Sequence, residues 1–454
     1  MRKIHMMGIG GIGMSAIAEL SIKKGDLVTG CDARLNYLTD KLRSMGAAVY
    51  EGHDSSHIFN DTDILVYSSA LKKDHPEIIE ANRKSVRIMR RAEMLSDVVG
   101  DKKLIAVTGT HGKTTTTFMI THVFNHAGMS PCFAAGGEMD ELGGNAGWGS
   151  GEYFIAEADE SDGTQRYLKP DSVVVTNIDC DHMENYSDIS HIASVMREFL
   201  GKVPDDGFVV GFGEDLEVAK MLKNVKAKAF SYGFNSDNDI CAADIQFGPF
   251  SSEFDIIFSG KKMGRVMLNI PGRHNVLNAL ACAAICLNYG IPFKEITAAF
   301  GSYPGVRRRL DVLFSDNNVM IIDDYAHHPS EIRAVVNTVK GMAKGRCMGV
   351  FQPHRYSRTK YLHEQFADCF EGLDEIVLTD IYGAGELPIT GIDGKLIYDV
   401  VVKNGGTEAV YIESKNKILE YILPRLKSGD VLVFMGAGDI TDIAHKAGEI
   451  LQVL

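Results

Sequence analysis

The sequence has no apolar run long enough to cross a membrane and no long run of lysine or arginine. A membrane-spanning helix needs about 20 consecutive apolar residues, so we expect no membrane insertion. A formal net charge of −13 without a basic tract argues against a surface for nucleic acid or anionic lipid, so we expect neither as a partner. Any anionic ligand would therefore need a local binding site.

Proline and cysteine are also sparse, with 12 and 8 residues among 454, and no low-complexity tract occurs, which indicates an ordered globular chain. Several cysteines lie in apolar helical context such as "LACAAICL", as reduced core cysteines do. Cys282 and Cys286 are four residues apart, but no histidine or cysteine flanks them with zinc-site spacing. The first residues lack the pattern of a signal peptide, so we expect a cytoplasmic protein.

The length predicts three domains, because a typical domain holds about 150 residues. Segment 1–97 alternates short apolar runs with amphipathic helices, the first expected over 15–24, which is typical of a parallel sheet. Segment 98–303 begins with "KLIAVTGT", and "GSYPGVRRRL" suits a linker to segment 304–454, where four strand-then-loop units follow. We therefore predict an α/β fold with a Rossmann-like N-terminal domain, a central P-loop ATPase-type domain and a Rossmann-like C-terminal domain.

The first glycine-rich stretch, "MGIGGIG", has the spacing of a dinucleotide-binding loop. Gly8, Gly10 and Gly13 form G-x-G-x-x-G around Gly11, between a predicted strand and a predicted helix, and Asp32 follows the second strand. Glycines let the backbone approach a pyrophosphate at a helix N-terminus, and the carboxylate can accept hydrogen bonds from a sugar. The loop predicts a nucleotide ligand and is compatible with both a nicotinamide dinucleotide and a UDP-type pyrophosphate.

The second stretch, "AVTGTHGKTTTT", is a P-loop with unusual spacing. Val107 stands where G-x-x-x-x-G-K-[ST] has its first glycine, and Gly109 supplies the turn instead. Backbone N–H groups of this loop would hold phosphate oxygens, Lys113 would neutralise their charge and the Thr114 hydroxyl would reach Mg²⁺. We predict that ATP binds here, through Gly109, Thr110, His111, Gly112, Lys113, Thr114 and Thr115.

This variant loop resembles that of the Mur ligases, the amide-forming enzymes of peptidoglycan synthesis. "GIGGIGMSAIAE", "EADESD", "DDYAHHP" and "FQPHRYSRT" resemble motifs of the same family and run through all three segments. The resemblance implies an ATP-dependent ligase that joins L-alanine to the lactyl carboxylate of UDP-N-acetylmuramate through an acyl phosphate. Two alternatives stay open: a recycling ligase that adds a ready-made tripeptide to the same UDP-sugar, and an NAD-dependent dehydrogenase. The sequence "ESDG" favours addition of alanine.

The resemblance also implies a site for Mg²⁺ or Mn²⁺. Alternation along a predicted strand places Glu157 and Asp159 on one face, and Asp181 and His182 lie just beyond the next strand. By resemblance, Glu157 and His182 are metal ligands, with Thr114 as a third beside ATP. Acidic groups beside a phosphate loop are consistent with this interpretation.

Other roles are likewise implied by the resemblance. The start of the helix in "RHNVLNALA" would contact adenine through His274, Asn275 and Asn278, while Arg309 would approach the phosphates and Asp324 the ribose. The pocket for the amino acid and the acyl phosphate would hold Tyr325, His327, His354, Arg355 and Arg358. An arginine fork suits a carboxylate because it can bind both oxygens. The catalytic set would be Lys113, His327, Arg355 and Arg358.

Ser68, Ser69 and His111 would contact the UDP-sugar, whereas one of His327 and His328 could simply pack and Glu386 in "YGAGELPITG" has no assigned role. For the oligomeric state we expect a monomer or a weak dimer.

One position departs from the wider family. Several Mur ligases carry a lysine about fifteen residues after the metal-site histidine, and its carbamate helps to hold a second Mg²⁺. Arg197 stands in that register here, and an arginine cannot form the carbamate. Lys202 is five residues further on, more than one helical turn away. We therefore expect activity that does not depend on bicarbonate, although Arg197 could also be an ordinary exposed residue of a helix.

Overall fold

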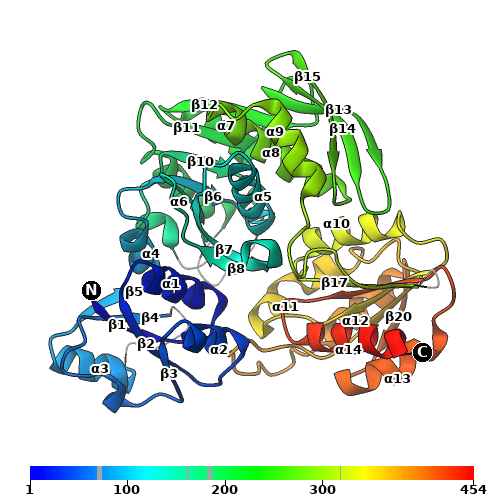
Figure 1. Ribbon diagram of the computed structural model, residues 1–454. Coiled ribbons are helices and arrows are strands. Elements are labelled where there is room, and N and C mark those ends of the chain that lie inside the picture. The colour runs from blue at the N-terminus through cyan, green and yellow to red at the C-terminus, as the bar shows by residue number, and fades with distance from the viewer. Residues whose placement is uncertain (69–73, 161–162, 181–185, 187, 317–318, 454) are drawn as a thin grey trace.

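The computed structural model describes residues 1–68, 74–160, 163–180, 186, 188–316 and 319–453. Three sheets follow one another along the chain, and each is the centre of one α/β part. Figure 1 shows the N-terminal part in blue, the middle part above it in cyan and green, and the C-terminal part in yellow to red. Among the described residues, no helix is both long enough and apolar enough to cross a membrane.

The N-terminal part is built on a five-stranded parallel sheet in the order β3-β2-β1-β4-β5. Its strands are β1 (Lys3–Met7), β2 (Leu27–Asp32), β3 (Ala48–Glu51), β4 (Ile64–Tyr67) and β5 (Arg87–Arg90). Its helices are α1 (Ile12–Lys23), α2 (Tyr37–Ser44), α3 (Pro76–Arg83) and α4 (Arg91–Val99), with the short 3₁₀ helix η1 (Ser55–His57). The strand order reverses at β1, where open α/β sheets bind their ligands.

The middle part contains a ten-stranded sheet in the order β15-β14-β13-β12-β11-β10-β6-β9-β7-β8. Its strands are β6 (Lys103–Thr108), β7 (Cys132–Met139), β8 (Gly144–Gly147), β9 (Tyr153–Glu157), β10 (Ser172–Val175), β11 (Phe208–Phe212), β12 (Lys228–Gly233), β13 (Ile240–Phe247), β14 (Ser252–Phe258) and β15 (Lys261–Leu268). Its helices are α5 (Lys113–His126), α6 (Ile189–Leu200), α7 (Leu216–Asn224), α8 (Arg273–Asn288) and α9 (Phe293–Ser302). Antiparallel pairs extend the sheet at both edges, which the sequence analysis did not anticipate.

The C-terminal part has a six-stranded sheet in the order β16-β17-β21-β18-β19-β20. Its strands are β16 (Asp311–Asp316), β17 (Val319–Asp324), β18 (Cys347–Phe351), β19 (Glu375–Leu378), β20 (Glu408–Tyr411) and β21 (Val431–Met435). Its helices are α10 (Pro329–Lys340), α11 (Tyr356–Leu362), α12 (Lys395–Asn404), α13 (Ile418–Ile422) and α14 (Ile440–Val453). The four expected strand-then-loop units are β17, β18, β19 and β21, while β16 adds an antiparallel edge.

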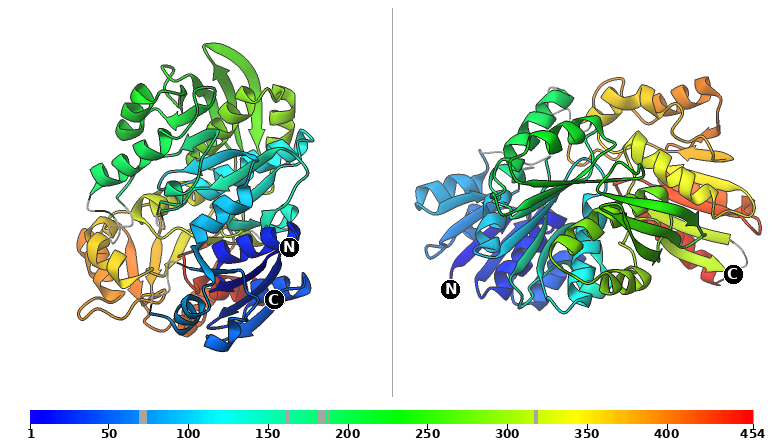
Figure 2. Two further views of the ribbon diagram at one scale, coloured as in Figure 1. Left: turned by 90° about the vertical axis from the view of Figure 1, so that its left-hand side faces the viewer. Right: turned by 90° about the horizontal axis from the view of Figure 1, so that it is seen from above.

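The N-terminal and middle parts share a hydrophobic core. One buried cluster runs from β1 and α1 into β6 and β9 and includes Ile17, Leu20, Leu104 and Phe154. The amide of Asn145 in β8 also donates a hydrogen bond to the Ser15 hydroxyl in α1, at 3.1 Å. The C-terminal part has separate clusters on the two faces of its own sheet. Both views in Figure 2 show the blue and cyan segments side by side.

Candidate active site

The P-loop joins β6 to α5 at the carboxyl edge of the middle sheet. Gly109 and Gly112 both have positive φ, 120° and 84°, a backbone conformation that favours glycine. A Cβ on Gly112 would lie 2.6 Å from Oδ1 of Asn278. Val107, by contrast, is a buried residue of β6 paired with Glu157 of β9. The turn therefore begins two residues later than in the usual P-loop, which explains the spacing.

Lys113 is the first residue of α5, and its ammonium group is almost enclosed. Its Nζ donates hydrogen bonds to the carbonyl oxygens of Gly109 at 2.7 Å and Thr110 at 3.0 Å, and it pairs with Glu160 at 2.9 Å. Burial alone would lower the pKa of Lys113, but the carboxylates of Glu160 and Asp159 outweigh this and raise it well above its usual value. The side chain therefore stays protonated at the mouth of the loop.

Two predicted metal ligands meet directly. The Thr114 hydroxyl donates to Oε2 of Glu157 at 2.8 Å, and the backbone N–H of Gly136 donates to the same oxygen at 2.8 Å. A carboxylate and a hydroxyl beside a phosphate loop are the hard oxygen donors that Mg²⁺ prefers, so these residues fit the ion. His182 and Asp181, like Ser69, lie outside the described residues.

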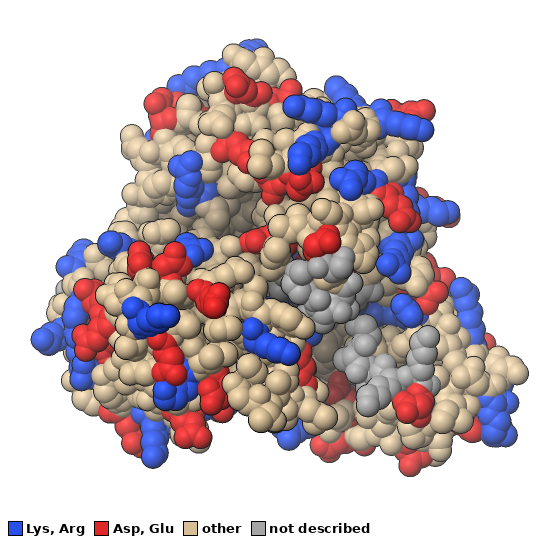
Figure 3. Space-filling model, turned by 180° about the vertical axis from the view of Figure 1, so that it is seen from behind, with Lys and Arg blue, Asp and Glu red and all other residues tan. Residues whose placement is uncertain are grey.

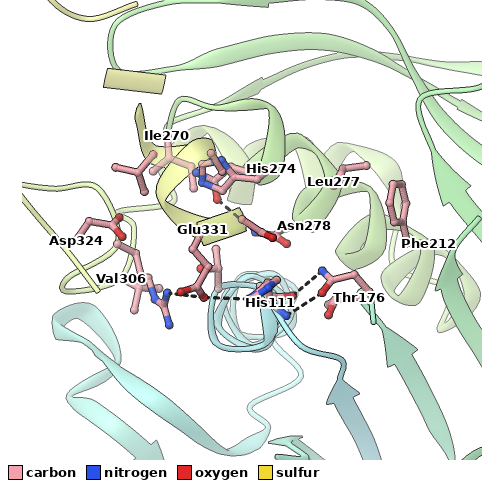
Figure 4. Close-up of a pocket in the computed structure, with 18 of the residues that line it drawn as sticks. His111, Thr176, Phe212, Ile270, His274, Leu277, Asn278, Val306, Asp324 and Glu331 are labelled. Atoms are coloured by element: carbon pink, nitrogen blue, oxygen red, sulfur yellow. Dashed lines mark hydrogen bonds and ion pairs between the residues drawn. The ribbon is translucent and has the colours of Figure 1, made fainter. Parts of the chain in front are cut away.

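A cavity of about 200 Å³ lies beside the P-loop, between α8 and α10. Eight of the predicted ATP-binding residues line it: His111, Gly112, Thr115, His274, Asn275, Asn278, Arg309 and Asp324. Figure 4 shows His111 and Glu331 pointing toward one another at one end, with Phe212 and Leu277 at another. The cavity thus combines an apolar wall with polar groups on the P-loop side, as small-molecule sites do.

His111 is held between two carboxylates. Its Nδ1 lies 3.2 Å from Oε1 of Glu331, and its Nε2 lies 3.2 Å from Oδ2 of Asp179. Burial by itself would lower the pKa of His111, but hydrogen bonds to Asp179 and Glu331 raise it to about 9. The imidazole is therefore cationic at neutral pH and joins the P-loop to the first turn of α10.

At the start of α8 the polar groups bond to one another. Burial, followed by the charge of Arg309, lowers the pKa of His274 to about 4, so its ring is neutral. The Asn275 amide donates to the carbonyl of Pro271 at 2.7 Å, and the Asn278 amide donates to Oδ1 of Asn275 at 3.3 Å. These side chains are therefore oriented before any ligand arrives.

Asp324 ends β17 and is almost fully buried. Its two oxygens accept backbone N–H bonds from Leu310 at 2.7 Å and Ala326 at 2.8 Å. Burial raises the pKa of its carboxyl group to about 6. The guanidinium of Arg309 lies over the Tyr325 ring at 5.0 Å. Asp324 thus holds the backbone just after Arg309 and just after Tyr325, in addition to lining the cavity.

A second cavity, of about 370 Å³, is lined by residues from all three parts of the molecule. Fifteen of the residues singled out in the sequence line it: Gly11, Gly13, Ser68, Thr110, Gly112, Lys113, Thr114, Glu157, Asp159, Arg309, Tyr325, His327, His354, Arg355 and Arg358. We call this cavity the three-part cleft. It brings the glycine-rich loop, the P-loop and the arginine-rich C-terminal segment to one space.

Other residues in and beside the glycine-rich loop hydrogen-bond to the loop backbone and hold its shape. Gly8, Gly10 and Asp32 do not line the cleft. Gly8 has φ of 74°, the Gly10 N–H donates to Oδ2 of Asp32 at 2.9 Å, and the Asn36 amide donates to the Gly10 carbonyl at 3.0 Å. Asp32 therefore holds the loop in shape, with its carboxylate on the loop backbone.

On the C-terminal side of the cleft, His327 and Arg358 are fixed by local bonds. Nδ1 of His327 lies 3.0 Å from the Tyr325 carbonyl, and Nη1 of Arg358 lies 3.1 Å from Nδ1 of His354. Glu386 accepts hydrogen bonds from the N–H and hydroxyl of Ser357, at 3.0 and 2.6 Å. Glu386, to which the sequence analysis assigned no role, thus caps the start of α11.

The other residues singled out in the sequence have these surroundings. Arg355 has a φ of 71°, and its Nη1 lies 3.8 Å from Oε1 of Glu386. His328 is buried and precedes α10, with Nε2 at 3.2 Å from the Cys180 carbonyl. Cys282 and Cys286 are buried in α8 with their sulfur atoms 3.8 Å apart. Arg197 is an exposed residue of α6, and the Nζ of Lys202 donates to the carbonyl oxygen of Gln165 at 2.9 Å.

The sequence analysis missed four polar residues of the site. The Arg91 guanidinium lies against the glycine-rich loop, where a Cβ on Gly13 would be 2.9 Å from its Nη1. Asn177 bonds the backbone of His111 in both directions, at 2.9 and 3.0 Å. Glu160 pairs with Lys113, and Glu331 with His111. Asn177, Glu160 and Glu331 follow or flank predicted strands, which is the one signal that could have indicated them, whereas Arg91 follows β5, a strand that the sequence analysis did not predict.

Three family models match the chain in order. They are "Mur ligase family, catalytic domain" over residues 3–103, "Mur ligase middle domain" over 107–286 and "Mur ligase, glutamate ligase domain" over 308–438. Among curated proteins, the UDP-N-acetylmuramate--L-alanine ligase of Trichlorobacter lovleyi is 41% identical over 99% of this chain and 98% of its own length. The ligase of the same name from Geobacter sulfurreducens is 41% identical over 96% and 95%.

Solved structures agree. The crystal structure of the UDP-N-acetylmuramate-alanine ligase MurC from Thermotoga maritima matches with a TM-score of 0.86 and 31% identity, over the full length of both chains. A murein peptide ligase from Psychrobacter arcticus matches with a TM-score of 0.74 at 23% identity, over 100% of this chain and 99% of its own. The second match, at this lower identity, shows the fold alone.

Proposed function

Because the chain belongs to the Mur ligase family, we propose that it joins L-alanine to the lactyl carboxylate of UDP-N-acetylmuramate in an ATP-dependent reaction. The observation that carries this proposal is the three-part cleft, where a pyrophosphate-type loop, a P-loop and an arginine-rich segment line one cavity. A dehydrogenase would have no use for the second loop and its buried lysine.

Forming an amide from a carboxylate and an amine in water is unfavourable, so the carboxylate must first become a good electrophile. Its oxygen would attack the γ-phosphorus of ATP, which gives an acyl phosphate and ADP. The neutral amine of alanine would then attack the acyl carbon, and phosphate would leave as the amide forms and the nitrogen loses a proton. Both steps place negative charge on oxygens that oriented cations and N–H groups can stabilise.

The residues of the middle part would hold ATP. The cavity beside the P-loop would take the adenosine end against α8, where the neutral His274 and the Asn278 amide are already oriented. Lys113 would stabilise the charge of the transferred phosphoryl group. Thr114, Glu157 and, outside the described residues, His182 would hold Mg²⁺ or Mn²⁺, which when bound neutralises phosphate charge.

The other two parts would supply the partners of the reaction. Gly11, Gly13 and Arg91 would bind the pyrophosphate of the UDP-sugar, and Ser68 would contact its sugar end. Across the cleft, Arg355 and Arg358 would bind the carboxylate of alanine and the acyl phosphate, with His327 beside them. This division explains why the lactyl carboxylate would meet ATP and alanine only in the cleft.

The nearest rival is the ligase that adds a ready-made tripeptide to the same UDP-sugar. The full-length curated relatives at 41% identity carry the name of the alanine-adding enzyme, which favours alanine.

We propose the cytoplasm as the compartment, supported by eight free cysteines, and a monomer or weak dimer as the assembly. On the face drawn in Figure 3, acidic and basic side chains are interspersed.

Phosphate release from ATP tests the proposal. The full-length protein with Mg²⁺ and UDP-N-acetylmuramate is assayed with L-alanine, with the tripeptide, and with neither, and the product is identified by mass. We expect release that requires both the UDP-sugar and L-alanine. Release that depends on the tripeptide alone would assign the recycling reaction instead. Binding of NADH without binding of the UDP-sugar would restore the dehydrogenase interpretation.

A further inference from the structure

Six side chains that the proposed reaction does not use gather in the N-terminal part, between the sheet and the layer formed by η1 and α3. They are His5, Cys31, His53, His57, His75 and Glu77. The centre of the group is Glu77, whose side chain is fully buried although a carboxylate rarely is. His5 of β1 and Cys31 of β2 are also fully buried. We call this group the His-Cys-Glu cluster.

Four potential ligand atoms of the cluster surround one point. Oε1 of Glu77 lies 2.8 Å from Nδ1 of His57, 3.2 Å from Sγ of Cys31 and 3.7 Å from Nε2 of His5. The ligand atoms of all four residues lie within 4.8 Å of one another. Bond lengths of about 2.0–2.3 Å in a tetrahedral zinc site place its ligand atoms about 3.3–3.8 Å apart. The observed separations bracket those values.

The ring of His5 gives the second, independent indication. Among the described residues, its buried Nε2 has no hydrogen-bond partner, and Oε1 of the Glu77 carboxylate lies 3.7 Å away. Its Nδ1 lies 2.8 Å from the hydroxyl of Thr29 on the neighbouring strand. If Nδ1 donates to that hydroxyl, the lone pair of Nε2 points into the cluster. Histidine ligands of metals are commonly oriented by such a bond from the other ring nitrogen.

We propose that this cluster is a structural zinc site whose ligands are Nε2 of His5, Sγ of Cys31, Nδ1 of His57 and a carboxylate oxygen of Glu77. Mixed nitrogen, sulfur and oxygen donors in a closed tetrahedral set are typical of zinc rather than of magnesium or calcium. A thiolate, a carboxylate and two neutral imidazoles would balance the charge of Zn²⁺, which suits a buried site.

The remaining two histidines lie at the rim. Nδ1 of His53 is 3.1 Å from Sγ of Cys31 and 3.3 Å from Glu77, so it would hydrogen-bond to ligand atoms. His75 precedes α3, with Nδ1 at 3.8 Å from Glu77. Their side chains are 19% and 16% exposed, whereas the ligands of β1 and β2 are fully enclosed. The rim is therefore the path by which an ion would enter.

The site would fasten one layer of the N-terminal part to another. Its ligands come from two strands, from η1 and from α3, so one ion would tie all four elements together. In Figure 1, α3 lies at the outer edge of the N-terminal part, away from the C-terminal part. None of the four ligands lines the three-part cleft, and the proposal does not depend on the proposed reaction.

Metal binding to the full-length protein tests the site. Metal-free protein is titrated with Zn²⁺ in excess Mg²⁺, which would occupy the proposed oxygen-donor site at the P-loop, and bound zinc is counted by mass spectrometry. Co²⁺ is then substituted, because a thiolate ligand gives an intense charge-transfer absorption in the near ultraviolet. We expect one Zn²⁺ per chain, a thiolate band, and a rise in the melting temperature on adding Zn²⁺.

Matched variants identify the ligands. Cys31→Ser should remove the thiolate band and lower zinc affinity by more than about 100-fold. Loss of a residue that only hydrogen-bonds to a ligand lowers affinity by at most about 100-fold. Cys180→Ser is the control, because Cys180 lies beside the histidines and Asp179 of the P-loop region and would give the band if that group bound the ion. Thr29→Val, which keeps every ligand, should weaken binding about 10- to 100-fold.

The wild-type protein decides the matter even if a variant fails to fold. Uptake of less than one Zn²⁺ per chain, or a cobalt complex without a thiolate band, would overturn the proposal. A band that survives Cys31→Ser, or disappears only in Cys180→Ser, would overturn it as well.

Discussion

Nδ1 of His111 lies 3.2 Å from Oε1 of Glu331, so the P-loop of the middle part is bonded directly to the first turn of α10 in the C-terminal part. The contact is polar and bridges parts whose hydrophobic clusters are separate. It also stands beside the cavity proposed for ATP. The ionisation of one imidazole therefore contributes to how the C-terminal part is held.

The first prediction is a pH dependence of stability. The pKa of His111 is raised in the folded protein to about 9, above its ordinary value of 6.5, so the imidazolium stabilises the folded state. This contribution is complete below about pH 6.5 and is lost as pH rises through about 9. Urea midpoints at pH 6, 8 and 10 should fall more steeply for the wild type than for His111→Gln. Parallel pH profiles would contradict the assignment.

The second prediction is closure of the C-terminal part. The proposed ATP and alanine sites lie on different parts joined by the segment 301–310, so the active arrangement should need movement about that segment. Small-angle scattering should show a smaller radius of gyration with an ATP analogue and UDP-N-acetylmuramate than without ligands. Identical profiles under both conditions would count against closure.

The third prediction concerns Lys113. Lys113→Ala should lower turnover by at least about 100-fold, because a positioned charge on the transferred phosphoryl group is lost. Lys261→Ala, in which an exposed lysine of β15 is removed, is the control and should turn over normally. Far-ultraviolet circular dichroism checks that both variants fold. Normal turnover of Lys113→Ala at saturating ATP would mean that the ATP site is elsewhere.

The fourth prediction separates the shape of the P-loop from its charge. Gly112→Ala should weaken ATP binding strongly, because the new Cβ needs a positive φ and would collide with Asn278. Gly128→Ala is a matched control: Gly128 also has positive φ, 74°, but its Cβ would meet nothing within 4 Å. Both substitutions introduce the same kind of backbone strain, but only Gly112→Ala adds the collision with Asn278. Calorimetric titration with ATP should therefore show the larger loss of affinity for Gly112→Ala. Equal losses would show that strain alone matters.

The fifth prediction is independence from bicarbonate. Arg197 is exposed on α6, and Lys202 donates to the backbone carbonyls of Gln165 and Arg166, so neither is expected to carry a metal-binding carbamate. Activity in CO₂-depleted buffer should therefore be the same with and without added bicarbonate. Recovery of lost activity on adding bicarbonate would show that a carbamylated lysine exists.

Local sequence predicted the loops well because their chemistry is written in consecutive residues. Gly109 and Gly112 adopt the positive φ that the "GTHGK" spacing implies, and Lys113 begins a helix as expected. The first helix begins at Ile12, three residues before its expected start at Ser15, because Gly11 already serves as its cap. The family models confirm the family resemblance, from which the other site residues were predicted, and the roles of those residues stay predictions.

Contacts between distant segments could not be read in the same way. Glu331 reaches His111 across 220 positions, and Arg91 reaches the glycine-rich loop from another strand end. The antiparallel strands β14 and β15 have mixed burial patterns, so their alternation did not stand out. The His-Cys-Glu cluster escaped notice because its members lie between positions 5 and 77, and only the fold brings His5 and Cys31 to the H-x-x-x-H pair of His53 and His57.

The core shared by the N-terminal and middle parts determines where this chain can be divided. Cutting after α4 would expose the apolar faces of α1 and of β6 to water at once, because both belong to one buried cluster. Apolar surfaces opened in this way promote aggregation. A fragment that ends near residue 303 keeps that cluster whole, although it loses Val306 from the second cluster of the middle part and the contact of His111 with Glu331. A fragment made for expression should therefore contain the first two parts together. A reporter domain should likewise not be inserted between them.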